Sequence, residues 1–317
     1  MLPKRVRDGT EIDVLRASLS PSDVKMLFTT LCCVMPWRTH LAIIAEWSMI
    51  LFAMWLLFRF GATAFPITLV IVGTRQRGLS TLLHEAGHCL MASNRRHNDV
   101  LGNLFLAFPL FDSVRRFRGV HVRHHFYLGD SESDADFHHA EEFVGQGGRQ
   151  LLRLLFSPAQ WFTRGWLGAL PVLGGRERIL ILCWWSVVLT LASLLVSKSA
   201  AFTFALVWIA ARVTVFYGIG FVLDFTDHVG LRPGTIAGFT RTCSSVWGLF
   251  WLHPYWNGFH LAHHLVPGIP WYNLRKAHHL LLTVPLYAAA HHCDGYLFGA
   301  HTALQCINRD CNRKGEH

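Results

Sequence analysis

Nine of the 20 histidines in this chain fall into four groups, in the sequences HEAGH, HVRHH, DFTDHVG and HLAHH. They are His84, His88, His121, His124, His125, His228, His260, His263 and His264. Residues three or four apart share one face of a helix, so each multi-histidine group can direct two or three imidazole rings at one point. Neutral imidazole binds iron, zinc, copper and nickel. Because one four-coordinate ion takes at most four protein ligands, nine grouped histidines predict two metal ions.

The other histidines are a weaker pattern, since residues such as His97, His253 and His301 stand alone. A lone histidine is usually a surface residue or a satisfied core residue, and we expect such roles here. The grouped histidines differ from these. Several imidazoles on one face repel one another when charged, and a metal ion is the simplest reason to crowd them.

The composition predicts a membrane protein. The 317 residues are 52% hydrophobic and only 15% charged, with a mean hydropathy of +0.31. Four apolar stretches, at 43–60, 61–74, 178–196 and 201–223, are candidate spans. The first is about 27 Å long as a helix, close to the thickness of the hydrocarbon layer, whereas the second is shorter and runs into Arg75. We therefore predict an all-α integral membrane protein with four transmembrane helices in two hairpins and a histidine-rich helical cap on the cytoplasmic side.

Lysine and arginine predict the orientation in the membrane. Residues 1–39 contain both lysine and arginine and 83–177 is rich in arginine, while the turns near Gly61 and Lys198 carry almost no charge. By the positive-inside rule, both termini, segment 83–177 and all four histidine groups face the cytoplasm. The net charge of +9 is then explained by anionic lipid headgroups, and we expect no nucleic-acid partner, because no nucleic-acid motif is visible. The expected organisation is a cytoplasmic segment (1–39), a membrane domain (40–285) and a cytoplasmic tail (286–317), in a bacterial inner membrane.

The order of these motifs resembles the integral-membrane fatty acid desaturase and hydroxylase family. The stretches RQRGLSTLLHEAGH and HLAHHLVPGIPWYNLRKAH resemble the approach to its first histidine box and its third box with the following Pro-Gly turn. His228, which precedes the third box by 32 residues, matches the isolated additional ligand of that family. The resemblance covers roughly residues 40–285 and combines motif, order and topology.

The resemblance implies a non-haem di-iron site (Fe²⁺/Fe³⁺) held by the nine histidines, with O₂ as cosubstrate. It implies desaturation of a fatty acyl or related lipid-like chain, or hydroxylation on the same scaffold. Electrons then come from a separate ferredoxin-like or cytochrome-like donor, because no cytochrome, Rieske or flavin motif is visible. Carboxylates can orient the ligand rings. The candidates for this supporting role are Asp224, Asp227, Asp136 and Glu85.

Two other functions stay open at this point. HEAGH is also an HExxH motif, so the chain could be an intramembrane zinc metalloprotease with Glu85 as general base and Asp224 as a further ligand. That interpretation leaves the six histidines of HVRHH and HLAHH without a role. A non-catalytic metal-binding or transport protein is the third possibility, and it would need polar residues within the spans. Apart from Arg75, Gln76 and Arg212, the spans offer few.

Overall fold

The computed structural model is mostly helical and describes residues 8–134, 168–245, 252–296 and 299–307, with a few isolated positions between them. The chain divides into two compact units. Unit 1 comprises Met1–Val34, Gly119–Leu154 and Val222–His317, and unit 2 comprises Met35–Arg118 and Leu155–Phe221. Each unit is described by itself.

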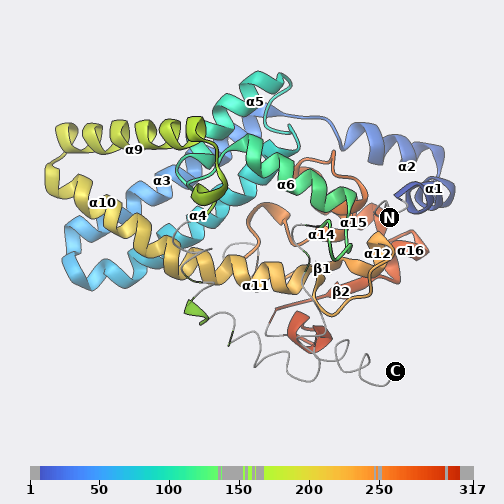
Figure 1. Cartoon of the computed structure of the whole chain (residues 1–317). Coiled ribbons are helices and arrows are strands. Elements are labelled where there is room, and N and C mark those ends of the chain that lie inside the picture. The colour runs from blue at the N-terminus through green and yellow to red at the C-terminus, as the bar shows by residue number, and fades with distance from the viewer. Residues whose placement is uncertain are drawn as a thin grey trace. The chain divides into compact units, whose positions relative to one another are not determined.

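Unit 2 begins with two long helices, α3 (Pro36–Phe60) and α4 (Phe65–Gly87), joined by the short helix η2 (Gly61–Ala64). A proline opens each long helix, and Gly61 ends α3 with φ of 63°. The two helices pack along each other, as Figure 1 shows in blue. Arg75 donates to the Glu46 carboxylate at 3.2 Å, and both side chains are buried. This ion pair lets α4 continue past the charged residues, so the helix is longer than the apolar stretch 61–74 that the sequence suggests.

A second helical pair follows, formed by α9 (Gly175–Leu195) and α10 (Lys198–Ala211), which pack together (Figure 1). The Ser197 side chain caps α10 by accepting from the Ala200 backbone at 3.0 Å. The chain continues through the π-helical turn η7 (Arg212–Phe216) into α11 (Tyr217–His228). Trp208 stacks on Trp47 of α3 with 5.5 Å between ring centroids, which ties α10 to the first pair.

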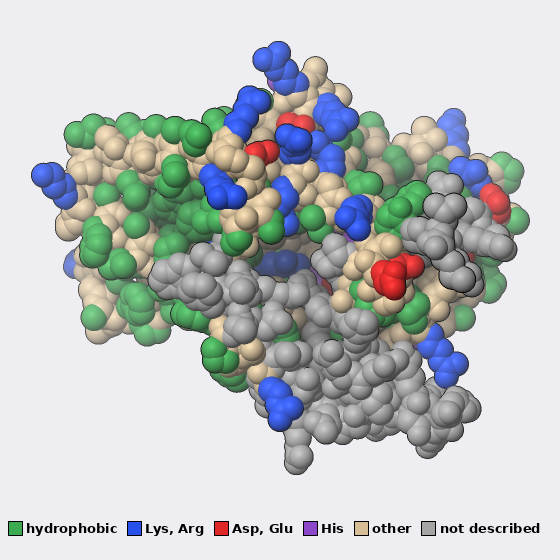
Figure 2. All heavy atoms as spheres, viewed as in Figure 1, with side chains coloured by type: hydrophobic (Ala, Val, Ile, Leu, Met, Phe, Trp, Pro, Cys, Tyr) green, Lys and Arg blue, Asp and Glu red, His purple; other side chains and the backbone are tan. Residues whose placement is uncertain are grey.

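Three helical segments of the described chain are long and apolar enough to cross a membrane, where the sequence predicts four. They are Pro36–Gly87, Gly175–Leu195 and Lys198–His228. The first segment contains both of the first two predicted stretches, because only the four-residue η2 separates α3 from α4. In α9 most apolar side chains are exposed and Ile181 is the one that is buried, and Figure 2 shows hydrophobic side chains over the area of α9 and α10. An apolar surface of this extent suits contact with lipid.

The rest of unit 2 links these helices to the histidine motifs. It contains α5 (Arg95–Gly102), η3 (Asn103–Ala107), the start of α6 (Val114–Phe126) and η6 (Leu170–Val172). The Asn94 side chain caps α5 by accepting from the backbone of Arg96 and His97. Both α6 and α11 run from one unit into the other.

Unit 1 is built from short elements around a buried apolar core. Its N-terminal part is α1 (Asp8–Ser18), α2 (Pro21–Lys25) and η1 (Met26–Thr30), and its C-terminal part is α12 (Ile236–Phe239), β1 (Arg241–Cys243), η8 (Pro254–Trp256), α14 (His260–Leu265), α15 (Trp271–Leu281), α16 (Pro285–Ala288) and β2 (His291–Cys293). Strands β1 and β2 pair in parallel, with Cys243 opposite Cys293. The all-α prediction is therefore wrong at this point, because three-residue strands leave no periodic pattern in a sequence.

The Glu11 carboxylate accepts from the backbone of Ile236 and Ala237, so the predicted N-terminal segment packs within unit 1.

Candidate metal centre

Helix α14 places three buried histidines of the last motif within six residues. His260 and His264 are one turn apart, and their Nε2 atoms lie 3.0 Å from each other. His263 lies between them in the sequence, and its Nε2 instead approaches Nε2 of His125 at 3.0 Å. One short helix therefore serves two separate groups of ring nitrogens, whereas the HxxHH spacing predicts that the rings of each motif meet at one point.

Four histidines of unit 1 form the first group, which we call the quartet: His124 on α6, His228 at the end of α11, and His260 and His264 on α14. All four are buried, and their ligand atoms lie within 4.8 Å of one another. Nε2 of His260 is 3.0 Å from Nε2 of His228 as well as from that of His264. The ring nitrogens thus converge on a common centre.

The outer nitrogens of two quartet rings hold the rings in place. Nδ1 of His228 donates to the backbone carbonyl of Phe239 at 2.8 Å, because a carbonyl can only accept. Nδ1 of His124 lies 2.8 Å from a carboxylate oxygen of Asp134, whose second oxygen accepts from the Gly129 backbone at 2.9 Å. With the proton on Nδ1, each ring turns the lone pair of Nε2 toward the centre, which is the arrangement of metal-binding histidines.

The donor set of the quartet fits a metal ion. Neutral rings with lone pairs meeting at 3.0 Å cannot all satisfy one another by hydrogen bonds, whereas a shared cation satisfies them together. Two ligands at right angles on an ion, each with a metal–nitrogen bond of about 2.1 Å, stand about 3.0 Å apart. Burial lowers the pKa of His264 well below its usual value, and the neighbouring His125 and His260 lower it further. A low pKa keeps the ring neutral and able to bind a metal.

The second group in unit 1, the triplet, consists of His121 and His125 on α6 and His263 on α14. Nε2 of His125 lies 3.0 Å from Nε2 of both His121 and His263. The same short spacing of lone pairs recurs here, so the triplet also suits a cation. Helix α6 contributes to both groups because His124 and His125 are adjacent and point to different neighbours.

The first motif lies in unit 2, where His84 and His88 end helix α4 with ring centroids 4.9 Å apart. Arg118 stabilises this helix end by donating to the carbonyls of Ala86 and Gly87, and it also pairs with Asp99. Burial, followed by the positive charge of Arg118, lowers the pKa of His88 to about 4. The ring of His88 is therefore a neutral ligand candidate, and His84 lies beside it.

The four predicted supporting carboxylates have different outcomes. Glu85 is buried, with one oxygen 3.7 Å from Nδ1 of His84. Asp227 lies 3.9 Å from Nε2 of His260 and 3.8 Å from Nε2 of His253, so the isolated His253 is buried beside the quartet rather than remote from it. Asp136 falls outside the described residues, as does the side chain of Asp224 on α11. Asp134, which contacts a quartet ring directly, was not among the sequence candidates.

Comparison with known proteins agrees with this architecture. A dihydrorhizobitoxine desaturase from Bradyrhizobium elkanii is 28% identical over 264 residues, covering 74% of this chain and 72% of that protein. A zeaxanthin 4-ketolase from Chlamydomonas reinhardtii is 27% identical over 202 residues (63% and 40%), and an sn-1 oleoyl-lipid 12-desaturase from Arthrospira platensis is 25% identical over 246 residues (66% and 66%). The family model described as fatty acid desaturase matches residues 60–295, well over half of the chain. The chain therefore belongs to the fatty acid desaturase family.

Proposed function

We propose that this protein is a membrane-bound, O₂-dependent di-iron oxidoreductase that desaturates a fatty acyl or related lipid-like chain. The observation that carries the proposal is the quartet: four buried histidines whose ligand atoms lie within 4.8 Å, in a chain of the fatty acid desaturase family. The quartet binds one iron, and the triplet supplies ligands for the second. Nine ligands exceed what one ion can use.

The protein's own groups have defined tasks in this proposal. Bound iron supplies the redox chemistry with O₂ that an unactivated C–H bond requires. Asp134 and the Phe239 carbonyl hold His124 and His228 in the tautomer that binds metal. Burial of the quartet keeps bulk water away from it. Asp227 lies 3.8 Å from the ring of His253 and 3.9 Å from that of His260, so a water molecule between them could connect the carboxylate to either ring.

The proposed setting is a membrane crossed four times, with both termini and the histidines on the cytoplasmic side. The distribution of lysine and arginine supports this orientation. A separate ferredoxin-like or cytochrome-like protein delivers the electrons, and the basic surface that includes α5 (Figure 2) suits an acidic donor. Purified protein with O₂ and substrate alone should be inactive and should regain activity when such a donor and its reductase are added.

The reaction is tested by mass spectrometry of lipid and small-molecule extracts from a host with and without the gene. Desaturation removes two hydrogen atoms from the substrate, which is the expected result. Hydroxylation adds one oxygen atom, and it is the second candidate because one of the relatives is a ketolase. Extracts without either change, from cells that hold iron-loaded protein and an electron donor, would count against both.

A further inference from the structure

A polar cavity of about 390 Å³ lies within unit 2, in the apolar part of the chain. Its walls come from α4, the start of α6, the loop before η6 and the turn η7. The polar side chains that line it are Ser80, Asp112, Arg116 and Arg212. The wall also includes Phe117, whose ring lies edge-on to His84 with 6.4 Å between ring centroids. The cavity is thus one aromatic ring away from a proposed metal ligand.

Arg212 is the unusual residue of this cavity. Arg212 is only 4% exposed, and no described residue accepts a hydrogen bond from its Nε or Nη1. The guanidinium instead packs over the rings of Phe111 and Phe216, at 5.3 and 5.2 Å from the ring centroids. An arginine within a membrane-crossing segment costs about 2.5–3.5 kcal/mol or more, so it marks a candidate functional site. A buried donor without an acceptor among the described residues suits a bound acceptor.

The charges around the cavity leave one positive charge in excess. Arg116 donates to both oxygens of Asp112, at 2.6 and 2.5 Å, so this pair is internally neutral. Among the described lining residues the sum is two arginines and one aspartate, hence +1, and the excess belongs to Arg212. A single carboxylate would balance it, and the planar guanidinium matches a carboxylate with two parallel hydrogen bonds.

Close packing fixes the guanidinium. Gly168, with φ of 54°, lies against Arg212 so closely that a Cβ atom there would stand only 2.1 Å from Nη2. The backbone at this position therefore leaves room for the arginine head. The arginine is held at the cavity by its aromatic neighbours on one side and by Gly168 on the other. Such preorganisation reduces the entropy lost on binding a ligand.

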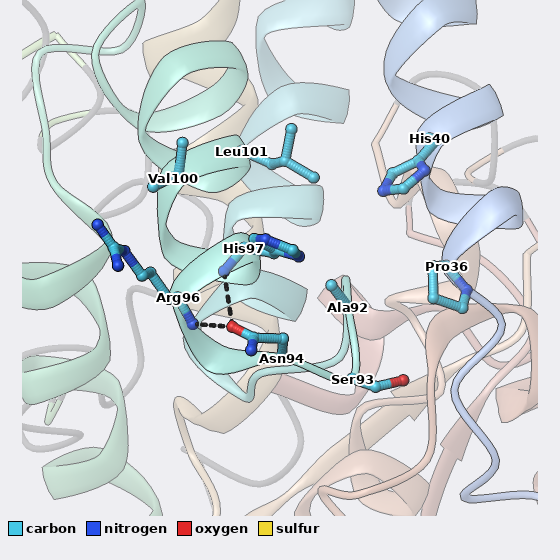
Figure 3. A pocket seen from close by; sticks show the side chains of 9 residues that line it. All are labelled: Pro36, His40, Ala92, Ser93, Asn94, Arg96, His97, Val100 and Leu101. Carbon is cyan, nitrogen blue, oxygen red and sulfur yellow. Dashed lines mark hydrogen bonds between the residues drawn. The ribbon is translucent and has the colours of Figure 1, made fainter.

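A second cavity in unit 2 lacks this character. It is about 660 Å³ and lies between the start of α3 and the segment 92–101, as Figure 3 shows. Asn94, the polar side chain at its floor, already accepts from the backbone of Arg96 and His97. His40 there has a buried Nε2 without a hydrogen-bond partner among the described residues, but the one arginine of the lining, Arg96, is exposed, so this cavity has no buried cation comparable to Arg212.

We infer that Arg212 binds the carboxylate of the substrate, and that the substrate is a free acid rather than an esterified lipid. The identification of this ligand as the substrate rests on the proposed function, whereas the anion site itself does not depend on that function. At about 30 Å³ for each water-sized group, the cavity accommodates on the order of a dozen non-hydrogen atoms. That size fits a short acid, and the single excess charge favours a monoanion.

The test measures binding directly, with full-length protein in detergent and without turnover. The probes are octanoate, whose size matches the estimate, 1-octanol as the uncharged analogue, and octyl phosphate as the mimic of a lipid phosphate. Wild-type protein should bind octanoate more tightly than 1-octanol or octyl phosphate. In Arg212→Met the affinity for octanoate should fall about tenfold to hundredfold, because a charge-assisted hydrogen bond is lost. The affinity for 1-octanol should not change.

The matched control is Arg59→Met, since Arg59 also lies over a phenylalanine ring of a long helix but is exposed and outside the cavity. It should leave octanoate binding unchanged. Arg212→Lys keeps the charge without the planar fork, and it should weaken octanoate binding while preserving the preference over 1-octanol.

Equal binding of octanoate and 1-octanol by the wild type would overturn the inference, and so would unchanged octanoate affinity in Arg212→Met or a preference for octyl phosphate. The two proposals fail separately. Octanoate that binds through Arg212 but is not oxidised speaks against the proposed reaction, whereas lipid oxidation that is indifferent to Arg212 speaks against the carboxylate site.

Discussion

The quartet in unit 1 and the Arg212 cavity in unit 2 both bury polar groups, but they differ in the charge they can accept. The quartet gathers neutral ring nitrogens whose lone pairs meet at 3.0 Å, which suits a cation. The cavity contains a guanidinium whose Nε and Nη1 have no acceptor among the described residues, which suits an anion. Burial alone therefore does not define a site. The sign of the charge that would satisfy the buried groups indicates what each region binds.

The two regions also differ in how their polar groups are supported. In the quartet, Asp134 and the Phe239 carbonyl fix the outer nitrogens of two rings. In the cavity, the guanidinium is held by aromatic rings and by the close approach of Gly168. Hydrogen bonds set the tautomer and direction of a ligand ring, whereas packing leaves the donors of an arginine available. The predictions below test these two kinds of support, beginning with the largest effect.

Removing a quartet ligand should have the largest effect. His260 is within 3.0 Å of two other ring nitrogens, so His260→Ala should abolish oxidation and lower the iron content from about two ions per chain to about one. Iron is measured by elemental analysis of purified protein. The control is His279→Ala, because His279 is exposed on α15 and is not part of either histidine group. Full iron occupancy in His260→Ala would break the assignment of the quartet as a metal site.

Asp134→Asn should reduce activity or metal affinity about 10- to 100-fold, the typical loss when a group that orients a ligand histidine is changed. An amide in place of the carboxylate weakens the bond to Nδ1 of His124 and permits the other tautomer. Iron affinity is measured by competition with a chelator. Asp130→Asn is the matched control, since Asp130 lies in the same loop and caps the backbone of Glu132 and Ser133 without contacting a histidine. Equal losses in both variants would show that the loop, and not the carboxylate, matters.

Asp134 also shows how far the sequence could lead. The grouping of the nine histidines was visible in the sequence because it follows helical spacing, but the division of α6 and α14 between two groups was not. Asp134 follows His124 by ten residues across a turn, and no periodicity connects the two. The partner of His228 is the backbone carbonyl of Phe239, which no side-chain pattern can reveal. Supporting contacts depend on the tertiary fold, whereas the histidine motifs are encoded locally.

The membrane helices give a similar lesson. Hydropathy located the apolar stretches, but it ended the second one at Arg75, whose charge is balanced inside the fold by Glu46 on α3. Arg212 appeared in the sequence only as one of a few polar residues in the spans. Its significance depends on the cavity and on Gly168, which is 44 residues earlier in the chain. A charge in an apolar segment is visible from sequence, but its partner is not.

Glu85 distinguishes an oxygenase from a zinc protease and should have a smaller effect than Asp134. Its oxygen is 3.7 Å from Nδ1 of His84, longer than a hydrogen bond, so we expect Glu85→Gln to lower oxidation by about tenfold at most. In a metalloprotease the same change would remove the general base and abolish catalysis with metal still bound. His84→Ala should be inactive in either case and serves as the reference. Peptide cleavage by the wild type, lost in Glu85→Gln, would favour the protease.

The smallest effect is expected at the cavity, where Asp112 is the one carboxylate among the described lining residues. Asp112→Asn should raise the local charge from +1 to +2 and tighten octanoate binding about two- to fivefold, an effect of the size typical for a partly solvated ion pair. The asparagine can still accept from the Ser113 backbone, as Asp112 does at 2.7 Å, so the local turn is retained. Asp99→Asn is the control, because Asp99 pairs with Arg118 outside the cavity. Tighter binding that fades at high salt supports an anion site. Weaker octanoate binding in Asp112→Asn, with unchanged binding in Asp99→Asn, would instead mean that Asp112 acts by positioning Arg116. The excess charge at Arg212 would then not by itself select the ligand.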